Sequence, residues 1–313
     1  MSVNWYPGHM VKARREIVEN IKLVDVVAEI LDARAPESTR NPDLEALCGK
    51  KPVLLVLNKH DLADPDLVKH WIKKYRKQGR EAVAINAVAG VGLPEVFKAI
   101  TRLFEPASKA MIAKNWRPRP PRVMVVGIPN VGKSTFMNSI LKKKSARTGP
   151  TPGVTRGKQW VRLQGKIDLL DTPGLMWPKV ENPEQGLRLA VLNLIGEKAY
   201  DEMDAANYAI QALCRQQPGA LKEKFGISVD GEPDLLALMT AIAMKRRFID
   251  GESPDLDRAG RYVLAGFRKG EYGRICLDRP EEFREEILPE PEPETAQMAS
   301  ELETPPKNQP ADE

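Results

Sequence analysis

The loop Gly127-Ile-Pro-Asn-Val-Gly-Lys-Ser134 contains residue types that could hold a polyphosphate. It matches the spacing GxxxxGK[ST] and lies between the apolar run 123–126 and a helical pattern at 133–141. Glycines allow a tight turn whose backbone N–H groups point at phosphate oxygens, and the helix that follows adds its positive N-terminal end. Lys133 is expected to reach the β and γ phosphates and to assist catalysis, and the Ser134 hydroxyl is expected to bind Mg²⁺. The residues expected around the phosphates are Asn130, Val131, Gly132, Lys133, Ser134 and Thr135.

A second motif, Asn58-Lys59-His60-Asp61, could bind a guanine base. It follows the apolar run 53–57, which is typical of a buried strand. An aspartate carboxylate can accept hydrogen bonds from N1–H and the exocyclic amine of guanine, whereas adenine offers no such donors. Sites that bond one specific edge discriminate by roughly four orders of magnitude. The residues expected around the base are Asn58, Lys59 and Asp61, together with Asn86 and Ala87, which follow the next apolar run.

Two further segments could complete a site for Mg²⁺ and the γ-phosphate. Asp171-Thr-Pro-Gly174 follows the apolar run 167–170. There Asp171 could hold Mg²⁺ through a water molecule, and the Gly174 N–H could contact the γ-phosphate. Thr155 lies between the phosphate loop and the next β-rich run, where a switch threonine would complete the Mg²⁺ coordination and assist catalysis. The motifs together predict a guanine nucleotide, GTP or GDP, with Mg²⁺ as the cofactor.

Six short β-rich runs alternate with helical patterns and could position these motifs. This alternation predicts an α/β fold with a six-stranded, mostly parallel, doubly wound sheet. The carboxyl ends of parallel strands meet at one edge, so the motifs would gather there. The expected strands are 24–31, 53–57, 82–85, 123–126, 159–163 and 167–170, and the helices between them are 10–22, 65–78, 93–104 and 133–141.

The order of the motifs along the chain is unusual. The base-binding motifs, at 58–61 and 86–87, precede the phosphate loop, whereas a conventional GTPase has the phosphate loop first. Chain order does not matter for a site assembled at strand ends. The order therefore predicts a circularly permuted P-loop G domain.

The remainder of the chain predicts two further parts. After about Trp177 four helical patterns follow, at 183–195, 201–216, 233–248 and 254–269. We expect a G domain over 1–177, a smaller all-α domain over 178–285 and a disordered acidic, Pro/Glu-rich tail over 286–313. The segment 105–122, which contains several prolines, is expected to be an irregular connector within the first domain.

Charge is distributed unevenly along the chain. The net charge is +5, but no Asp or Glu and fourteen Lys or Arg occur between Pro106 and Ile167, whereas residues 281–313 hold eleven acids and two bases. An acid-free basic stretch is typical of a surface that faces phosphates or RNA, although a solvated face gives the same pattern. The tail could be a solubilising extension or could cover the basic surface.

The cysteines and the apolar runs bear on localisation. The three cysteines are far apart and form no CxxC, which favours a reducing, cytoplasmic location over a disulfide framework. The N-terminus has no apolar segment of the kind that directs secretion. The longest apolar runs fall far short of the ~20 residues that cross a bilayer, so no membrane partner is expected.

Several motifs together resemble the ribosome biogenesis GTPase A (YlqF/RbgA-like) family of circularly permuted GTPases, which act in large-subunit assembly. They are NWYPGHMVKARRE, LDARAPESTRNP, LNKHDLAD, GIPNVGKST, PGVTRGKQW, LLDTPGLMWPK and GLRLAVL, and they extend over about residues 4–285. The resemblance implies a GTPase that binds a late precursor of the large ribosomal subunit and is stimulated by it. It also implies contacts of the helical domain with rRNA and ribosomal proteins, and we expect the protein to be a monomer.

The resemblance also bears on single residues. Leu175 follows the Asp171–Gly174 motif where many GTPases have a catalytic glutamine, and an apolar side chain cannot orient water. The family assigns that task to the histidine of PGHM, here His9, which from local sequence alone would be a loop residue. Asn130 matches a position that in related GTPases helps coordinate K⁺, and its other role would be loop geometry. Trp5, Trp116, Trp160 and Trp177 are expected to pack in the core or between domains rather than to stack on bases.

Two other functions fit parts of the sequence. One is a permuted GTPase that acts on the small subunit, although the OB barrel or Cys-rich module of such proteins is not visible here. The other is a GTP-responsive RNA-binding scaffold with little hydrolysis, because the glutamine is missing.

Overall fold

The computed structural model describes residues 3–4, 15, 17–142, 160–163, 166–171, 179–180, 182–228 and 233–283. Its centre is a six-stranded sheet in the order β4-β3-β2-β5-β7-β6, in which only β6 is antiparallel to its neighbour. All six expected strands are confirmed, each within two residues at either end. They are β2 (Val26–Asp32), β3 (Val53–Asn58), β4 (Glu81–Ala84), β5 (Arg122–Val126), β6 (Trp160–Leu163) and β7 (Ile167–Asp171).

Helices cover both faces of the sheet because the strands are apolar on both sides. Alternate residues such as Ala28 and Ile30 pack against α4 (Leu93–Ala113) and α5 (Lys133–Lys142). The intervening residues, such as Leu31, pack against α3 (Pro65–Lys77) or against a second cluster that includes α2 (Leu44–Cys48) and residues 17–21. The pleat of each strand therefore divides its side chains between two cores, as the prediction of a doubly wound fold requires.

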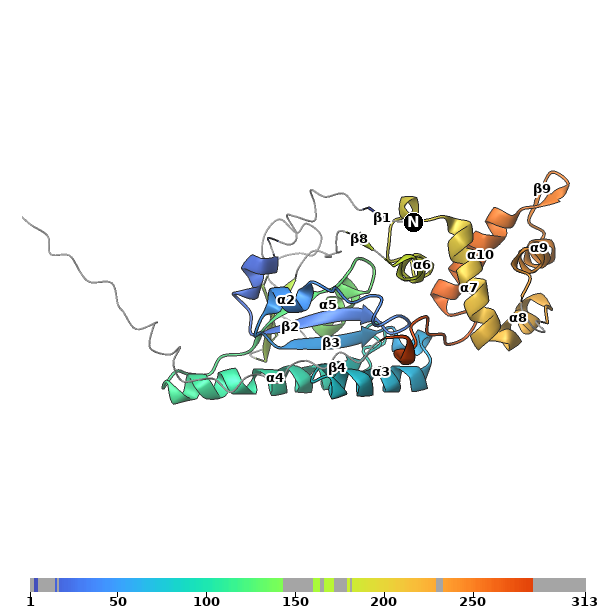
Figure 1. The fold of residues 1–313 in the computed structure, drawn as a ribbon. Helices are drawn as coiled ribbons and strands as arrows, with labels where there is room; N and C mark the ends of the chain where they lie inside the picture. The colour runs from blue at the N-terminus through green and yellow to red at the C-terminus, as the bar shows by residue number, and fades with distance from the viewer. Residues whose placement is uncertain are drawn as a thin grey trace, which may run out of the picture.

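A helical half follows the sheet (Figure 1). Aspartate or asparagine side chains accept backbone N–H groups at the starts of α6, α7, α9 and α10, which explains where these helices begin. The short α8 was not expected, because it starts at Pro218 only two residues after α7 ends. The helices are α6 (Pro183–Val191), α7 (Glu202–Gln216), α8 (Pro218–Phe225), α9 (Leu235–Arg246) and α10 (Leu256–Lys269).

The expectation of an irregular connector at 105–122 was wrong over its first half. Helix α4 continues through Pro106 to Ala113. Pro106 is exposed, and a proline inside a helix removes one hydrogen bond and crowds the carbonyl one turn earlier. The residues beyond it include strong helix formers, and Lys109 forms an ion pair with Glu105 one turn away (2.9 Å). Local propensity therefore outweighs the single proline.

The last described residues leave the helical half and return to the sheet. The Ile275 N–H donates to the carbonyl of Leu62 (3.1 Å), and Cys276 is buried in the same cluster as Trp71. The Lys74 ammonium donates to the carbonyls of Pro280 and Phe283 (2.5 Å each). The last described residues of the chain therefore pack against α3. Within the described ranges, no helix combines the length and apolarity that crossing a membrane requires.

Candidate nucleotide-binding site

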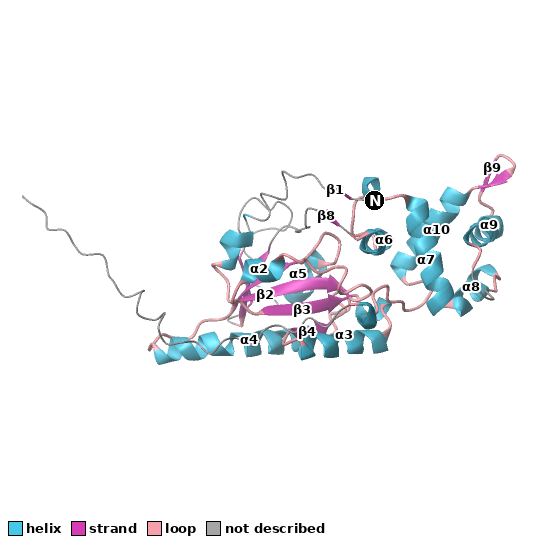
Figure 2. Ribbon diagram, viewed as in Figure 1, coloured by secondary structure: helices cyan, strands magenta, loops and turns pink. Residues whose placement is uncertain are grey.

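The five parallel strands end at one edge of the sheet, and the predicted motifs lie on the loops at this edge. In Figure 2 the arrows of β2 and β3 both point toward the helical half. The chain passes from β2 to β3 and β4 on one side of β2, and then crosses to β5 on its other side. This change of direction makes the crevice beyond β2 and β5 the expected ligand position in an open α/β sheet. The phosphate loop leaves β5 at that point.

The phosphate loop has the tight backbone that its glycines predict. Gly127 has a φ of 149°, and a Cβ there would lie 2.6 Å from the carbonyl oxygen of Ile30. Gly132 has a φ of 103°, and a Cβ there would collide with the amide nitrogen of Asn58. Asn130 adopts a left-handed conformation with a φ of 61°. Only glycine fits at 127 and 132, because the loop lies directly against the ends of β2 and β3.

Asn58 joins the phosphate loop to the base-binding loop. Its side chain is buried, its Nδ2 donates to the carbonyl of Val131 (2.9 Å), and its Oδ1 accepts the Ala87 N–H (3.0 Å). Ser139 of α5 donates to the carbonyl of Ala87 on the other side. Asn86 forms an isolated bridge with Val91, and its side chain accepts the N–H of Ala89 (3.0 Å). The phosphate loop and the base-binding loop, which are distant in the sequence, are thus held together by the end of β3.

Lys59 connects the same two loops to the end of β2. Its φ is 60°, and its ammonium contacts the carbonyl of Asn130 (3.1 Å) and the carboxylate of Asp32 (2.9 Å). Arg34 donates to both oxygens of Asp32, at 2.9 Å and 2.8 Å. Burial opposes ionisation of Asp32, but Arg34 and Lys59 outweigh it and hold the pKa of that carboxyl well below its usual range. Asp32 is therefore a buried anion that fixes Lys59.

The remaining predicted residues have the following positions. Asp61 lies in the 3₁₀ turn η1 (His60–Leu62), with its side chain exposed at the strand-end edge. Lys133 donates to the carbonyl of Ile128 within the phosphate loop (2.8 Å), and Ser134 and Thr135 are exposed at the start of α5. Asp171 is the last residue of β7, paired with Val125 of β5. The expectations for His9, Thr155 and Gly174 lie outside the described residues.

A short pair of strands adjoins two of those undescribed segments. The strand β1 (Val3–Asn4) pairs antiparallel with β8 (Lys179–Val180). Along the sequence, His9 is five residues beyond Asn4, and Gly174 is five residues before Lys179. Five residues span at most ~18 Å. The described residues nearest in sequence to PGHM and to DTPG therefore lie opposite each other at this pair.

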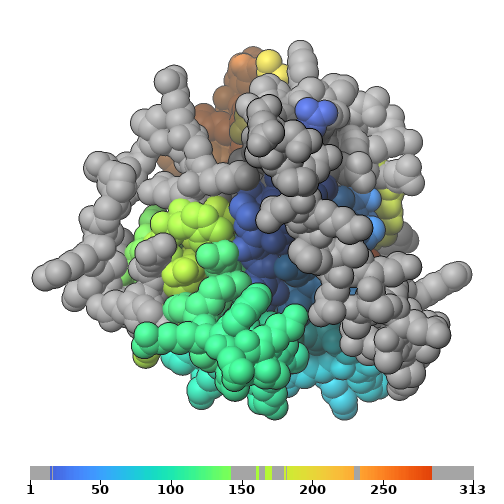
Figure 3. Space-filling model, turned by 90° about the vertical axis from the view of Figure 1, so that its left-hand side faces the viewer, coloured from blue at the N-terminus to red at the C-terminus, as the bar shows by residue number. Residues whose placement is uncertain are grey.

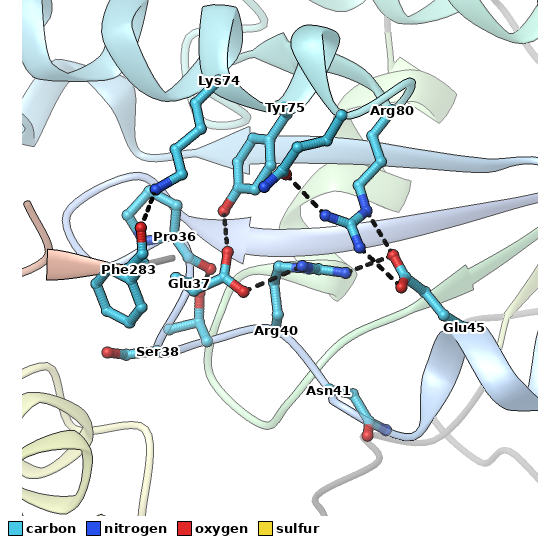
Figure 4. A network of polar contacts seen from close by, with 12 residues as sticks. Pro36, Glu37, Ser38, Arg40, Asn41, Glu45, Lys74, Tyr75, Arg80 and Phe283 are labelled. Atoms are coloured by element: carbon cyan, nitrogen blue, oxygen red, sulfur yellow. Dashed lines mark hydrogen bonds and ion pairs between the residues drawn. The ribbon is translucent and has the colours of Figure 1, made fainter. Parts of the chain in front are cut away.

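Sequence reasoning missed Asp32 and Arg34 as parts of the site. The available indication was their position, because LDAR follows a buried strand just as the NKHD motif follows the next one. The loop after them is fastened by a polar network (Figure 4). Arg40 contacts Glu37 (3.0 Å) and Glu45 (2.6 Å), and Tyr75 donates to Glu37 (2.9 Å). This network makes the loop a rigid support for Arg34.

The phosphate loop and the loop that follows β2 also contact the helical half. The Asn130 amide donates to the carbonyl of Asn193, just after α6 (2.9 Å), and Arg34 donates to the carbonyl of Arg268 in α10 (3.3 Å). Buried Asp278 accepts from the Ser38 N–H (2.7 Å) and from Arg188 of α6 (2.9 Å). Burial raises the pKa of Asp278 to about 6, although these donors oppose the rise. The nucleotide loops and the helices are thus in direct contact.

Comparisons with known proteins agree with this geometry. The family described as "50S ribosome-binding GTPase" matches residues 122–221. A Ribosome biogenesis GTPase A from Bacillus cereus is 42% identical over 288 residues, which cover 92% of this chain and 97% of that protein. The protein of the same name from Thermotoga maritima is 29% identical and covers 90% of this chain and 96% of its own. Mitochondrial ribosome-associated GTPase 1 from Bos taurus is 31% identical, with 88% of each chain covered.

Solved structures show the same fold. The GDP-bound structure of TM YlqF aligns with a TM-score of 0.61 at 25% identity, covering 85% of this chain and 100% of that one. GNP-bound YlqF from T. maritima aligns with a TM-score of 0.59 at 25% identity, covering 86% and 99%. The similarity therefore extends over the sheet and the helical half.

Proposed function

The chain belongs to the ribosome biogenesis GTPase A family of circularly permuted GTPases, and from that premise we propose that it binds a late precursor of the large ribosomal subunit and hydrolyses GTP there. Hydrolysis to GDP and phosphate would drive maturation of the particle and release of the protein. The observation that carries the proposal is the buried Asn58 side chain, which bonds both the phosphate loop and the base loop. The description of the family that matches residues 122–221 supports the large subunit as partner.

Each half has a role in this proposal. The G domain, residues 1–177, would hold the nucleotide, and the helical domain, 178–285, would contact rRNA and ribosomal proteins. The contacts of Asn130 with Asn193 and of Arg34 with Arg268 support communication between the two halves. The protein would act as a monomer in the cytoplasm, with residues 286–313 as a solvated tail.

The residues of the site suit a triphosphate with its metal ion. Ser134 is exposed at the N-terminus of α5, and Asp171 ends β7 beside β5, the strand from which the phosphate loop leaves. Hydroxyl and carboxylate oxygens are the kind of ligand that Mg²⁺ prefers. Ser134 and Thr155 would bind Mg²⁺ directly, Asp171 would bind it through water, and Asn130 could hold K⁺. The ions would neutralise charge on the phosphates. Lys133, which now donates to Ile128, would turn to the β and γ phosphates, and Gly174 would contact the γ-phosphate.

His9 is proposed to orient the attacking water, since Leu175 cannot. The pairing of β1 with β8 supports this role, because Asn4 and Lys179 lie opposite each other and are five residues along the chain from His9 and Gly174, respectively. His9→Ala is expected to lower particle-stimulated GTP turnover about 100-fold and to leave GTP affinity unchanged, because a positioned acid–base group acts mainly on the chemical step. Steady-state phosphate release and nucleotide titration measure the two effects separately.

A matched control is His70→Ala. His70 is exposed on α3 and lies outside the predicted nucleotide motifs, so this variant should behave as the unmodified chain. Unchanged stimulated turnover in His9→Ala would remove His9 from the mechanism, and the GTPase assignment would remain.

A further inference from the structure

The second half of helix α4 extends beyond the sheet. The buried residues of α4 end at Phe104, the twelfth of its 21 residues. From residue 105 to residue 113 no side chain is buried, and Figure 1 shows the helix running past the end of the strands opposite the helical half. Only the partly buried Met111 of this extension packs against the core, so most of its side chains face solvent.

The extension ends at an exposed tryptophan. The Trp116 side chain is 64% exposed, which contradicts the expectation that it packs in the core or between domains. Its backbone is fixed, because the Trp116 N–H donates to the carbonyl of Met111 (2.9 Å) after a left-handed turn at Asn115. The Lys114 ammonium lies 5.9 Å from the centre of the ring. A large aromatic ring is thus held at the surface beside a cation.

Basic side chains surround this end of the sheet. Hydrogen bonds join the strand starts here, from Lys51 to Val24 (2.6 Å) and from Asp168 to Pro121 (2.9 Å). Asp25 is bound by Arg119 (2.7 Å), which offsets its charge. The exposed bases at these segments are Lys22, Lys50, Lys114, Arg117 and Lys166.

Figure 3 looks onto this side of the molecule. There the green end of α4 stands beside the dark blue residues that precede β2 and the yellow-green residues of β6 and β7. We call the surface formed by Trp116, Lys114 and Arg117 the Trp116 platform, and the other three bases lie on segments at the same end of the sheet. It lies at the amino ends of the parallel strands, and the nucleotide loops lie at their carboxyl ends.

We propose that the Trp116 platform binds an unpaired segment of RNA. The Trp116 ring stacks on one base, and Lys114 and Arg117 contact the phosphates on either side. Stacking suits any base, because each has a π-face, whereas a paired base within a helix is not accessible to the ring. The inference rests on the proposed function only for the source of the RNA, which is the rRNA of the particle. RNA bound here does not compete with GTP, because the two sites are at opposite ends of the sheet.

The test is binding of a fluorescein-labelled single-stranded oligouridylate to the full chain, measured by fluorescence anisotropy. Trp116→Ala is expected to weaken binding about 5- to 100-fold, whereas Trp116→Phe keeps most of the affinity because it retains a ring. A double-stranded RNA should bind both variants as it binds the unmodified chain. Lys114→Ala combined with Arg117→Ala should reduce the magnitude of the slope of log affinity against log salt by about 1.4, because each phosphate contact on a single strand contributes about 0.7.

The control is His70→Ala, which removes an exposed ring on α3, outside both the platform and the helical half. It should leave binding of the oligouridylate unchanged. Equal binding by Trp116→Ala and the unmodified chain would overturn the proposal. Binding of an acidic peptide with the sequence of 286–313 to the platform in preference to RNA would also overturn it. Particle-stimulated GTP hydrolysis is measured separately on the same variants, so failure here leaves the proposed function intact.

Discussion

Asp61→Asn is expected to lower affinity for GTP by roughly 10⁴-fold and to make xanthosine triphosphate the preferred nucleotide. The carboxylate accepts from both N1–H and the exocyclic amine of guanine, and an amide cannot accept both bonds. Xanthine has a carbonyl in place of that amine, so the amide of the variant can donate to it. Asp61 is exposed in η1, and the residue just before this turn is Lys59, whose contact with Asp32 fixes the turn.

Direct titration of each variant with ribose-labelled fluorescent GTP and ribose-labelled fluorescent xanthosine triphosphate measures this exchange of specificity. Asp66→Asn is the control, because it removes the same charge from an exposed position on α3, where the carboxylate pairs only with Lys69 among the described side chains (2.9 Å). The control should bind GTP normally. If Asp61→Asn kept its preference for GTP, the base would have to bind elsewhere.

Asp32→Asn is expected to lower the free energy of unfolding by about 3–5 kcal/mol, because it leaves Arg34 buried without its anion. The two partners lie 2.8 Å apart, and both side chains are almost wholly buried. Urea unfolding at neutral pH measures the loss. The same variant should bind GTP more weakly, because Lys59 loses the partner that holds it between the two loops.

The effect of Asp32 depends on pH in a defined direction. Its pKa is depressed in the folded state, so its stabilisation is present above the unfolded pKa of about 4 and is lost as the pH falls below it. The difference in stability between the unmodified chain and Asp32→Asn should therefore shrink in acid. Asp66→Asn again serves as the control, with a change of less than about 0.5 kcal/mol. A full-sized gap that persists in acid would exclude an ionised Asp32.

The parts of the fold that sequence predicted are those that local pattern determines. The buried runs that became β2 to β7 are short apolar segments bounded by turn residues, so their positions follow from composition alone. The phosphate loop and the NKHD motif were identifiable because their spacing is fixed by the ligand. The extension of α4 was missed because the prolines at 118, 120 and 121 indicated an irregular connector over the whole segment, although helix formers follow Pro106.

Long-range contacts could not be predicted in the same way. Asn58 was expected to bind nucleotide, but its bond to Val131 spans 73 residues and appears only when β3 and β5 lie in one sheet. The contact of Ser38 with Asp278 spans 240 residues. The exposure of Trp116 could not be predicted either, because tryptophan side chains are usually packed and no local sequence pattern marks where the core ends. The functional groups were therefore predictable, and most of the residues that hold them were not.

The most direct test of the proposed function is GTP hydrolysis by the full chain in the presence of purified large or small ribosomal subunits, each added separately at low and moderate salt. We expect slow hydrolysis by the protein alone, strong stimulation by the large subunit and none by the small subunit. Electrostatic contacts with rRNA should make the stimulation weaker at the higher salt. Stimulation by the small subunit alone, or no hydrolysis with either particle, would contradict an assembly factor of the large subunit.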